Sequence, residues 1–383
     1  MRDVISLHAD RRRKRSDGQA KKTMKQNTKT GGFIVLAMLG STVLLASPAS
    51  ANLALDVTYD FSNDSGITPT QENQVETAFN AVAEQFEAAI TNPITVTVQV
   101  SVGTINGTTQ TLPSGNDSGS YTNVVKMGTT AATSFAATEA ALANTGATLP
   151  ATDPTGGGHL YYMPQAEFKA LGLSPAGYPA LNALDGYIGF TSNLSLFSFS
   201  GTPSSSQVSF QASAEHEIEE VLGRISSLND GGLTSSYEAL PLDLFRYSSP
   251  GVTSFSENAA AYASTNGGVT DLGAFENVDA DADRSDWLTS SPANSTDAQN
   301  SIFSQGVNEG LSISDEDVLK GLGYTVAANN GAGLFNGSNA PVGATPSVNN
   351  PQTVPEPGTL SLLAVGAGLA WLIRRRGGRF VPA

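Results

Sequence analysis

The stretch "SAEHEIEEVLGR", residues 213–224, decides how the rest of the chain is interpreted. His216 and Glu220 lie four residues apart in it, and Glu217 directly follows the histidine. In an α-helix, residues four apart differ by about 40° around the axis, so they share one face. An imidazole and a carboxylate can therefore converge on one cation from a single helical turn. Gly223, seven residues after His216, returns to the same side of such a helix.

Two interpretations of this stretch stay open. Apolar residues lie on both sides of the acidic run, namely Val208, Phe210, Ile218, Val221, Leu222 and Ile225. They predict a helix over 208–228, capped by Ser209 or Ser213, with one face in a core. The alternative is a solvated acidic helix, because a run of Glu residues is typical of a protein surface; the run comprises Glu215, Glu217, Glu219 and Glu220.

Hydrophobic periodicity predicts the surrounding elements. Alternating or β-branched runs indicate strands at 53–61, 94–102 and 185–192. Apolar spacings of three and four indicate a helix at 70–90, and 122–143 is prone to helix formation. Residues 314–324 read as a short helix capped by Ser314, with Asp317 three residues further on. This order predicts an α+β fold with a mixed sheet around the His-Glu helix.

The composition excludes several classes of function. Residues 52–353 carry six Lys or Arg against 31 Asp or Glu, a net charge of −25, so no nucleic-acid partner is expected. The chain has no cysteine, which excludes disulfides, thiolate metal sites and cysteine nucleophiles. It has three histidines, so any transition metal must be held by histidine and carboxylate side chains.

The two ends of the chain predict export. Residues 1–51 have a basic region, an apolar run at 32–46 and an Ala-x-Ala pattern, so we expect a signal peptide cleaved after Ala51. The folded body then spans 52–326, and 327–353 reads as a flexible linker rich in Gly, Asn and Pro. A short apolar membrane segment at 359–373 is followed by three arginines.

The tail at 354–379 resembles the PEP-CTERM sorting signal, because "PEP", an apolar span and an arginine run follow in that order. The resemblance implies that membrane-bound sorting machinery processes the tail. The protein is then exported through the inner membrane to the cell surface or the extracellular matrix.

The body itself resembles metzincin-type zinc proteases, and in particular zinc metalloproteases that carry PEP-CTERM tails. The resemblance lies in "HEIEEVLGR" and "LDLFRYSSPG" and, more loosely, in "ITNPITVTVQV" and "DVLKGLGY". It implies a zincin-like catalytic domain in which His216 and Glu220 bind Zn²⁺ and Glu217 is the general base. The chain departs from the metzincin pattern twice, with Glu220 in place of a histidine and Ser226 in place of the third ligand.

A catalytic zinc site needs about three protein ligands, so a third must come from elsewhere. Asp243 is the first choice, because a carboxylate within an apolar segment is costly unless it is paired or ligating. Arg246 offers the pairing alternative, and Glu238 and His159 are the other candidate ligands. One histidine and two carboxylates make a neutral site that acidifies water less than three histidines do and that also suits Mn²⁺ or Ca²⁺.

A second acidic cluster precedes Trp287. "DADADRSDW" begins like a calcium loop, with carboxylates at Asp279, Asp281, Asp283 and Asp286. Arg284 replaces the glycine that an EF-hand loop requires, and a solvated loop is the alternative.

Together these features predict an exported, zinc-dependent metallopeptidase that acts on polypeptides. The alternative is a catalytically inactive surface protein with a metalloprotease-like domain that binds exopolysaccharide in the extracellular matrix.

Overall fold

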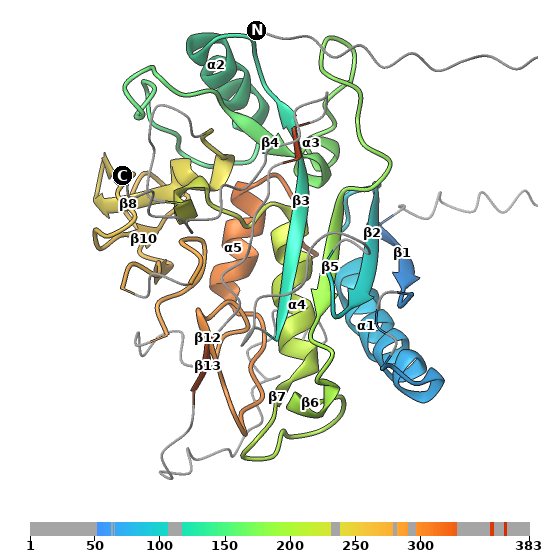
Figure 1. Cartoon of the computed structure of the whole chain (residues 1–383). Coiled ribbons are helices and arrows are strands. Elements are labelled where there is room, and N and C mark those ends of the chain that lie inside the picture. Colours follow the sequence, from blue (N-terminus) through green and yellow to red (C-terminus); the bar gives the residue numbers. More distant parts are fainter. Residues whose placement is uncertain are drawn as a thin grey trace, which may run out of the picture. The chain divides into compact units, whose positions relative to one another are not determined.

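A mixed β-sheet flanks the central helix α4 (Figure 1). In this computed structural model the described residues are 52–62, 64, 66–105, 117–230, 238–278, 282–289 and 296–327, with short strands at 353–355 and 364–365. The predicted signal peptide, most of the linker and most of the predicted membrane segment lie outside these residues. Within the described residues, the helices are all too short or too polar to cross a membrane.

The sheet is built from segments with alternating or β-branched sequence. Strand β1 (Ala54–Asp60) runs parallel to β2 (Thr95–Val102), which runs parallel to β5 (Gly186–Phe190). Strand β3 (Ser118–Lys126) is antiparallel to β5 and to β4 (Tyr162–Pro164), and β14 (Ala364–Val365) pairs with β3. These pairings confirm the three predicted strands and the mixed sheet.

Helix α1 (Pro69–Ala89) confirms the helix predicted at 70–90. Thr68 forms a capping box with Gln71, and Pro69 occupies the first helical position, where no amide hydrogen is needed. Its apolar stripe, which includes Phe79 and Phe86, is buried in the core.

The helix predicted over 122–143 is wrong in its first part. Residues up to Lys126 belong to β3, and helix α2 (Ala131–Leu142) begins only after the cap residue Thr130. Pairing with β5 and β4 fixes this segment as a strand, and the β-branched Val124 and Val125 suit that conformation. Ser120 and Thr122 on β3 thereby face helix α4, as their hydrogen bonds to Glu220 show.

Helix α4 (Phe210–Leu222) is shorter than the predicted 208–228. The hydroxyl of Ser209 accepts a hydrogen bond from the Ala212 amide and caps the helix. The helix ends at Gly223, whose φ of 126° strongly favours glycine. Residues 208–209 form strand β7 (Val208–Ser209), which pairs with β6 (Phe197–Ser198).

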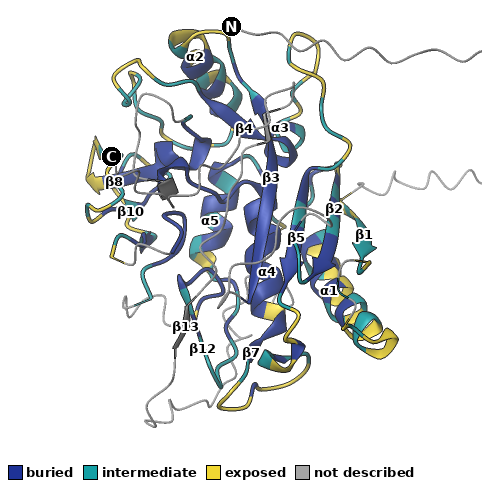
Figure 2. Ribbon diagram, viewed as in Figure 1, coloured by how far each residue is buried: buried dark blue, intermediate teal, exposed yellow. Residues whose placement is uncertain are grey.

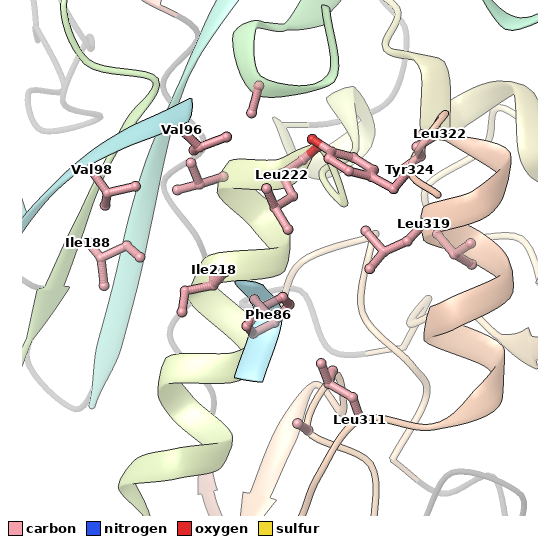
Figure 3. Close-up of a cluster of buried hydrophobic side chains, with 14 of the residues drawn as sticks. Phe86, Val96, Val98, Ile188, Ile218, Leu222, Leu311, Leu319, Leu322 and Tyr324 are labelled. Atoms are coloured by element: carbon pink, nitrogen blue, oxygen red, sulfur yellow. The ribbon is translucent and has the colours of Figure 1, made fainter. Parts of the chain in front are cut away.

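The N-cap of helix α5 (Ile313–Gly321) lies two residues before the predicted cap. Ser312, not Ser314, is the N-cap, because its amide and hydroxyl both donate to the Asp315 carboxylate. Ile218 and Leu222 of α4, Val98 and Ile188 of the sheet, and Leu319 and Tyr324 around α5 belong to one buried cluster (Figure 3). The core thus holds α4 between the sheet and α5.

Shorter elements complete the described residues. They are α3 (Gln165–Ala170), η1 (Leu194–Leu196), η2 (Ser227–Asp230), η3 (Pro241–Phe245), β8 (Arg246–Ser249), β9 (Val252–Thr253), β10 (Tyr262–Ala263), β11 (Gly273–Ala274), β12 (Ile302–Ser304) and β13 (Thr353–Pro355).

Glu167 on α3 makes the stability of the fold depend on pH. Its side chain is buried, and neither carboxyl oxygen has a hydrogen-bond partner among the residues that the structure describes. Burial raises the pKa of Glu167 well above 4.5, so the folded state keeps this carboxyl protonated.

We therefore expect Glu167→Gln to stabilise the protein increasingly as the pH rises. With the wild-type residue, the free energy of unfolding falls as the pH rises from the ordinary carboxyl pKa through the raised one, by at most ~1.4 kcal/mol per pH unit. The neutral Gln has no such loss. Urea unfolding of both proteins between pH ~5 and ~8 checks this; parallel curves for the two proteins would contradict it.

Candidate metal centre

The acidic side chains of α4 are inside the protein, so the solvated helix is not what forms (Figure 2). Glu215, Glu217, Glu219 and Glu220 are each at most 1% exposed. Buried carboxylates are costly unless cations, protons or hydrogen-bond donors compensate them. The question for this helix is therefore what compensates each one.

The side chains of α4 divide among three directions around the helix. Ile218, Val221 and Leu222 pack in the hydrophobic core. Glu215 and Glu219 lie on a second side, where the Glu219 carboxylate is 3.6 Å from the Arg224 guanidinium. His216 and Glu220 lie on a third side, which faces residues 282–289.

Three potential ligands converge on that third side. His216 Nε2 lies 3.5 Å from Glu220 Oε1 and 3.8 Å from Asp286 Oδ1. One donor atom from each of these residues lies within 4.8 Å of the other two, and all three side chains are buried. Ligand atoms ~2.1 Å from a tetrahedral cation lie ~3.4 Å from one another, so this spacing fits a shared cation.

The backbone fixes the orientation of His216. Its Nδ1 lies 3.0 Å from the carbonyl oxygen of Ala298, and because a carbonyl only accepts, Nδ1 carries the proton. Nε2 is thereby turned toward the two carboxylates, as in metal-binding histidines. Burial lowers the pKa of His216, but Glu220 and Asp286 outweigh it and leave that pKa above 6.5.

Strand β3 holds Glu220 at two points. The Ser120 hydroxyl donates to Oε2 at 2.7 Å, and the Thr122 hydroxyl donates to the Glu220 main-chain carbonyl at 3.0 Å. Oε1 is left on the side of His216. Burial raises the pKa of Glu220, but contacts with His216, Glu217 and Ser120 together lower it below 4.5, so this carboxylate is ionised.

Asp286 is held by a turn and a backbone bridge. Its Oδ2 accepts a hydrogen bond from the Asp283 amide at 3.1 Å, and its own amide donates to the Asp283 carbonyl. The next residue, Trp287, pairs its backbone with Gln299 and Ser301. Because Ala298 lies in that same segment, one run of backbone pairing sets both Asp286 and the carbonyl that orients His216.

Further carboxyl groups surround the three ligands. Burial raises the pKa of Glu217, and the charges of Glu220 and Asp117 add to the effect. Burial also raises the pKa of Asp283, next to Asp286 and Glu220, and brings the pKa of Asp117 to about 6. A cation at the centre of such a concentration of buried acidic groups would stabilise it.

The donor set fits a divalent transition metal. One imidazole nitrogen and two carboxylate oxygens suit Zn²⁺, and Mn²⁺ accepts the same ligands. The residues present therefore meet the requirement for three protein ligands, although not with the residue predicted to be the third.

Asp243 lies outside this group. Its carboxylate accepts hydrogen bonds from the hydroxyls of Ser226 and Ser227 and from the Leu240 amide. Ser226, at the position of the missing metzincin ligand, thus bonds to the residue predicted to replace it. Glu238 and His159 are half-buried, and neither belongs to the group that gathers around His216.

The structure instead joins the two sites that the sequence suggested separately. Asp283 and Asp286 of the predicted calcium loop are buried beside α4, whereas Asp279 and Asp281 lie outside the described residues. Spacing along the chain gave no sign of this meeting, because Asp286 follows Glu220 by 66 residues. The adjacent Trp287, a large apolar residue in an acidic loop, was the available signal that the loop is buried.

Comparison with known proteins identifies the tail. Residues 353–376 match the model of the PEP-CTERM protein-sorting motif. No curated protein and no solved structure matches the chain. The fold and site thus define a mixed α/β protein with a buried His-Glu-Asp group, and the matched motif is a sorting signal for export to the cell surface or the extracellular space.

Proposed function

We propose that this protein is an exported, metal-dependent hydrolase that cleaves peptide bonds. The observation that carries the proposal is the convergence of His216 Nε2, Glu220 Oε1 and Asp286 Oδ1, with Glu217 beside them on the same helix. Zn²⁺ is the cation proposed for this donor set. A bound Zn²⁺ polarises a carbonyl oxygen and acidifies water.

Three side chains of α4 have the other roles in the proposed reaction. His216, fixed by Ala298, presents one nitrogen lone pair, and Glu220, fixed by Ser120, presents one carboxylate oxygen. Glu217 accepts a proton from the attacking water and passes it to the amine that leaves. A cation held by the three ligands would favour the ionised form of Glu217 that this step requires, while burial raises the pKa of Glu217 and makes its carboxylate a stronger base than an exposed one.

The polypeptide substrate rests on the similarity of "HEIEEVLGR" to the active-site helix of zinc metalloproteases. The PEP-CTERM tail supports the place of action, because it directs the protein out of the cell. We accordingly propose extracellular or surface polypeptides as substrates.

Glu217→Gln tests the catalytic role. We expect the variant to bind metal as the wild type does and to lose peptide hydrolysis by at least ~10²-fold, which is typical when a general base is removed. Glu215→Gln is the matched control, because Glu215 is equally buried but bonds to Gln211 on another side of α4. Equal activity of wild type and Glu217→Gln on a peptide library would contradict the proposal.

One observation favours a second candidate function. His216, Glu217, Glu220 and Asp286 are at most 1% exposed, which suits a closed structural metal site. The protein would then be a catalytically inactive component of the extracellular matrix that associates with exopolysaccharide. Full metal occupancy without hydrolysis, together with retention on immobilised exopolysaccharide, is the result that this alternative predicts.

A further inference from the structure

Arg224 lies at the point where several parts of the metal centre meet. It follows the end of α4 by two residues and is 0% exposed. Its guanidinium lies 4.3 Å from the centre of the Trp287 ring and donates to the side-chain oxygen of Gln299. Carboxylates flank it, with Glu219 at 3.6 Å and Asp315 at 3.5 Å.

Two of these contacts lead directly to metal ligands. Trp287 immediately follows Asp286, so the stacked guanidinium sets the position of the residue next to a ligand. Gln299 immediately follows Ala298, whose carbonyl orients His216, and the Gln299 side chain also donates to the His216 main-chain carbonyl at 3.3 Å.

We infer that Arg224 is a positioning residue of the metal centre. Through Trp287 it places Asp286, and through Gln299 it holds the Ala298 carbonyl against His216 Nδ1. This inference rests on the metal centre of the proposed function and goes beyond it, because Arg224 itself touches none of the three ligand atoms.

The contacts require arginine in particular. A planar guanidinium can lie on an indole, donate one hydrogen bond in its plane and keep its other nitrogens beside two carboxylates, whereas the ammonium of lysine is a compact charge without a flat face. Arg224 also compensates Glu219 and Asp315, which are both fully buried. A lysine keeps that charge compensation but loses the planar group that covers Trp287 while its Nη1 donates to Gln299.

Arg224→Lys therefore separates positioning from charge. We expect Zn²⁺ to bind at least ~10-fold more weakly, as is typical when a contact that supports a metal ligand is lost. The visible absorption spectrum of the Co²⁺-substituted protein should also change, because that spectrum reports ligand geometry. Zn²⁺ affinity is measured by competition with a chromophoric chelator.

Tyr324→Phe is the control. Tyr324 is buried and donates to the Leu222 carbonyl at 2.6 Å, so its loss weakens the same end of α4 without touching Trp287 or Gln299. We expect this variant to lose stability but to keep the wild-type affinity and Co²⁺ spectrum. Trp287→Phe, which removes the indole and its bond to Asp315, serves as a second variant if Arg224→Lys does not fold.

The outcomes distinguish this inference from the proposed function. Wild-type affinity and spectrum in the folded Arg224→Lys or Trp287→Phe variant would overturn the inference and leave the metal centre intact. A wild-type protein that binds neither Zn²⁺ nor Co²⁺ would overturn both.

Discussion

For the proposed metal centre, removing the cation with a chelator is expected to loosen residues 282–289 and 296–311 while the sheet and α1 stay protected. These segments bury many polar groups and have little regular structure beyond β12. Asp286 docks against Glu220, and without a cation two carboxylates meet in a buried space. The free energy of metal binding would therefore contribute to the docking of these two segments on α4.

Hydrogen exchange with and without chelator measures the effect. At a cation concentration ~100-fold above the dissociation constant, the bound form gains ~2.7 kcal/mol of stability, which a thermal melt also detects. His216→Ala in the presence of metal should reproduce the exchange pattern of the chelated wild type. Identical exchange of these two segments in both states would show that the cation does not hold them.

Trp287→Ala is expected to give the largest loss of stability among single side-chain changes near the site. The indole is fully buried, stacks on Phe275 with ring centres 5.4 Å apart and donates to Asp315 at 2.8 Å. Its removal leaves a cavity, which typically lowers the free energy of unfolding by ~3–5 kcal/mol, and Arg224 and Asp315 lose their contacts with the indole. Metal affinity should fall as well, because Asp286 loses its neighbour.

Phe79→Ala is the matched control for this prediction. Phe79 is buried between α1 and the sheet, and a comparable loss of stability is expected there. The metal affinity of folded Phe79→Ala should equal that of the wild type. Urea unfolding measures the stability of both variants, and chelator competition measures their metal affinity. Equal metal affinities in the two variants would show that Trp287 does not support the metal site.

Local sequence patterns were sufficient to predict many of the helices and strands. The apolar spacing of α1 and the alternation of β1 and β2 are local patterns, and each produced the expected element. The two ends of α4 are also set by local effects. Ser209 caps the start with its side chain, and Gly223 ends the helix with a backbone conformation that glycine tolerates. The helix prediction failed at residues 122–126, because the pairing of β3 with β5 and β4, which is not local, overrides helix propensity there.

The candidate site could be predicted only for its helical half. His216 and Glu220 share a face because helix geometry alone decides it. The apolar surroundings of Asp243 correctly indicated a buried carboxylate that needs partners, but those partners are the hydroxyls of Ser226 and Ser227. Asp286 reaches the site through the tertiary packing of Trp287 and residues 297–301, which no spacing along the chain encodes.

The metal content of two purified variants shows whether Asp286 or Asp243 is the third ligand. We expect the reconstituted wild type to hold stoichiometric Zn²⁺ and Asp286→Asn to lose it, because the substitution replaces a carboxylate ligand with a neutral amide. Asp243→Asn should keep the metal and lose only stability, since it weakens the bonds from Ser226, Ser227 and Leu240. Loss of metal in Asp243→Asn with full occupancy in Asp286→Asn would show that Asp286 is not a ligand.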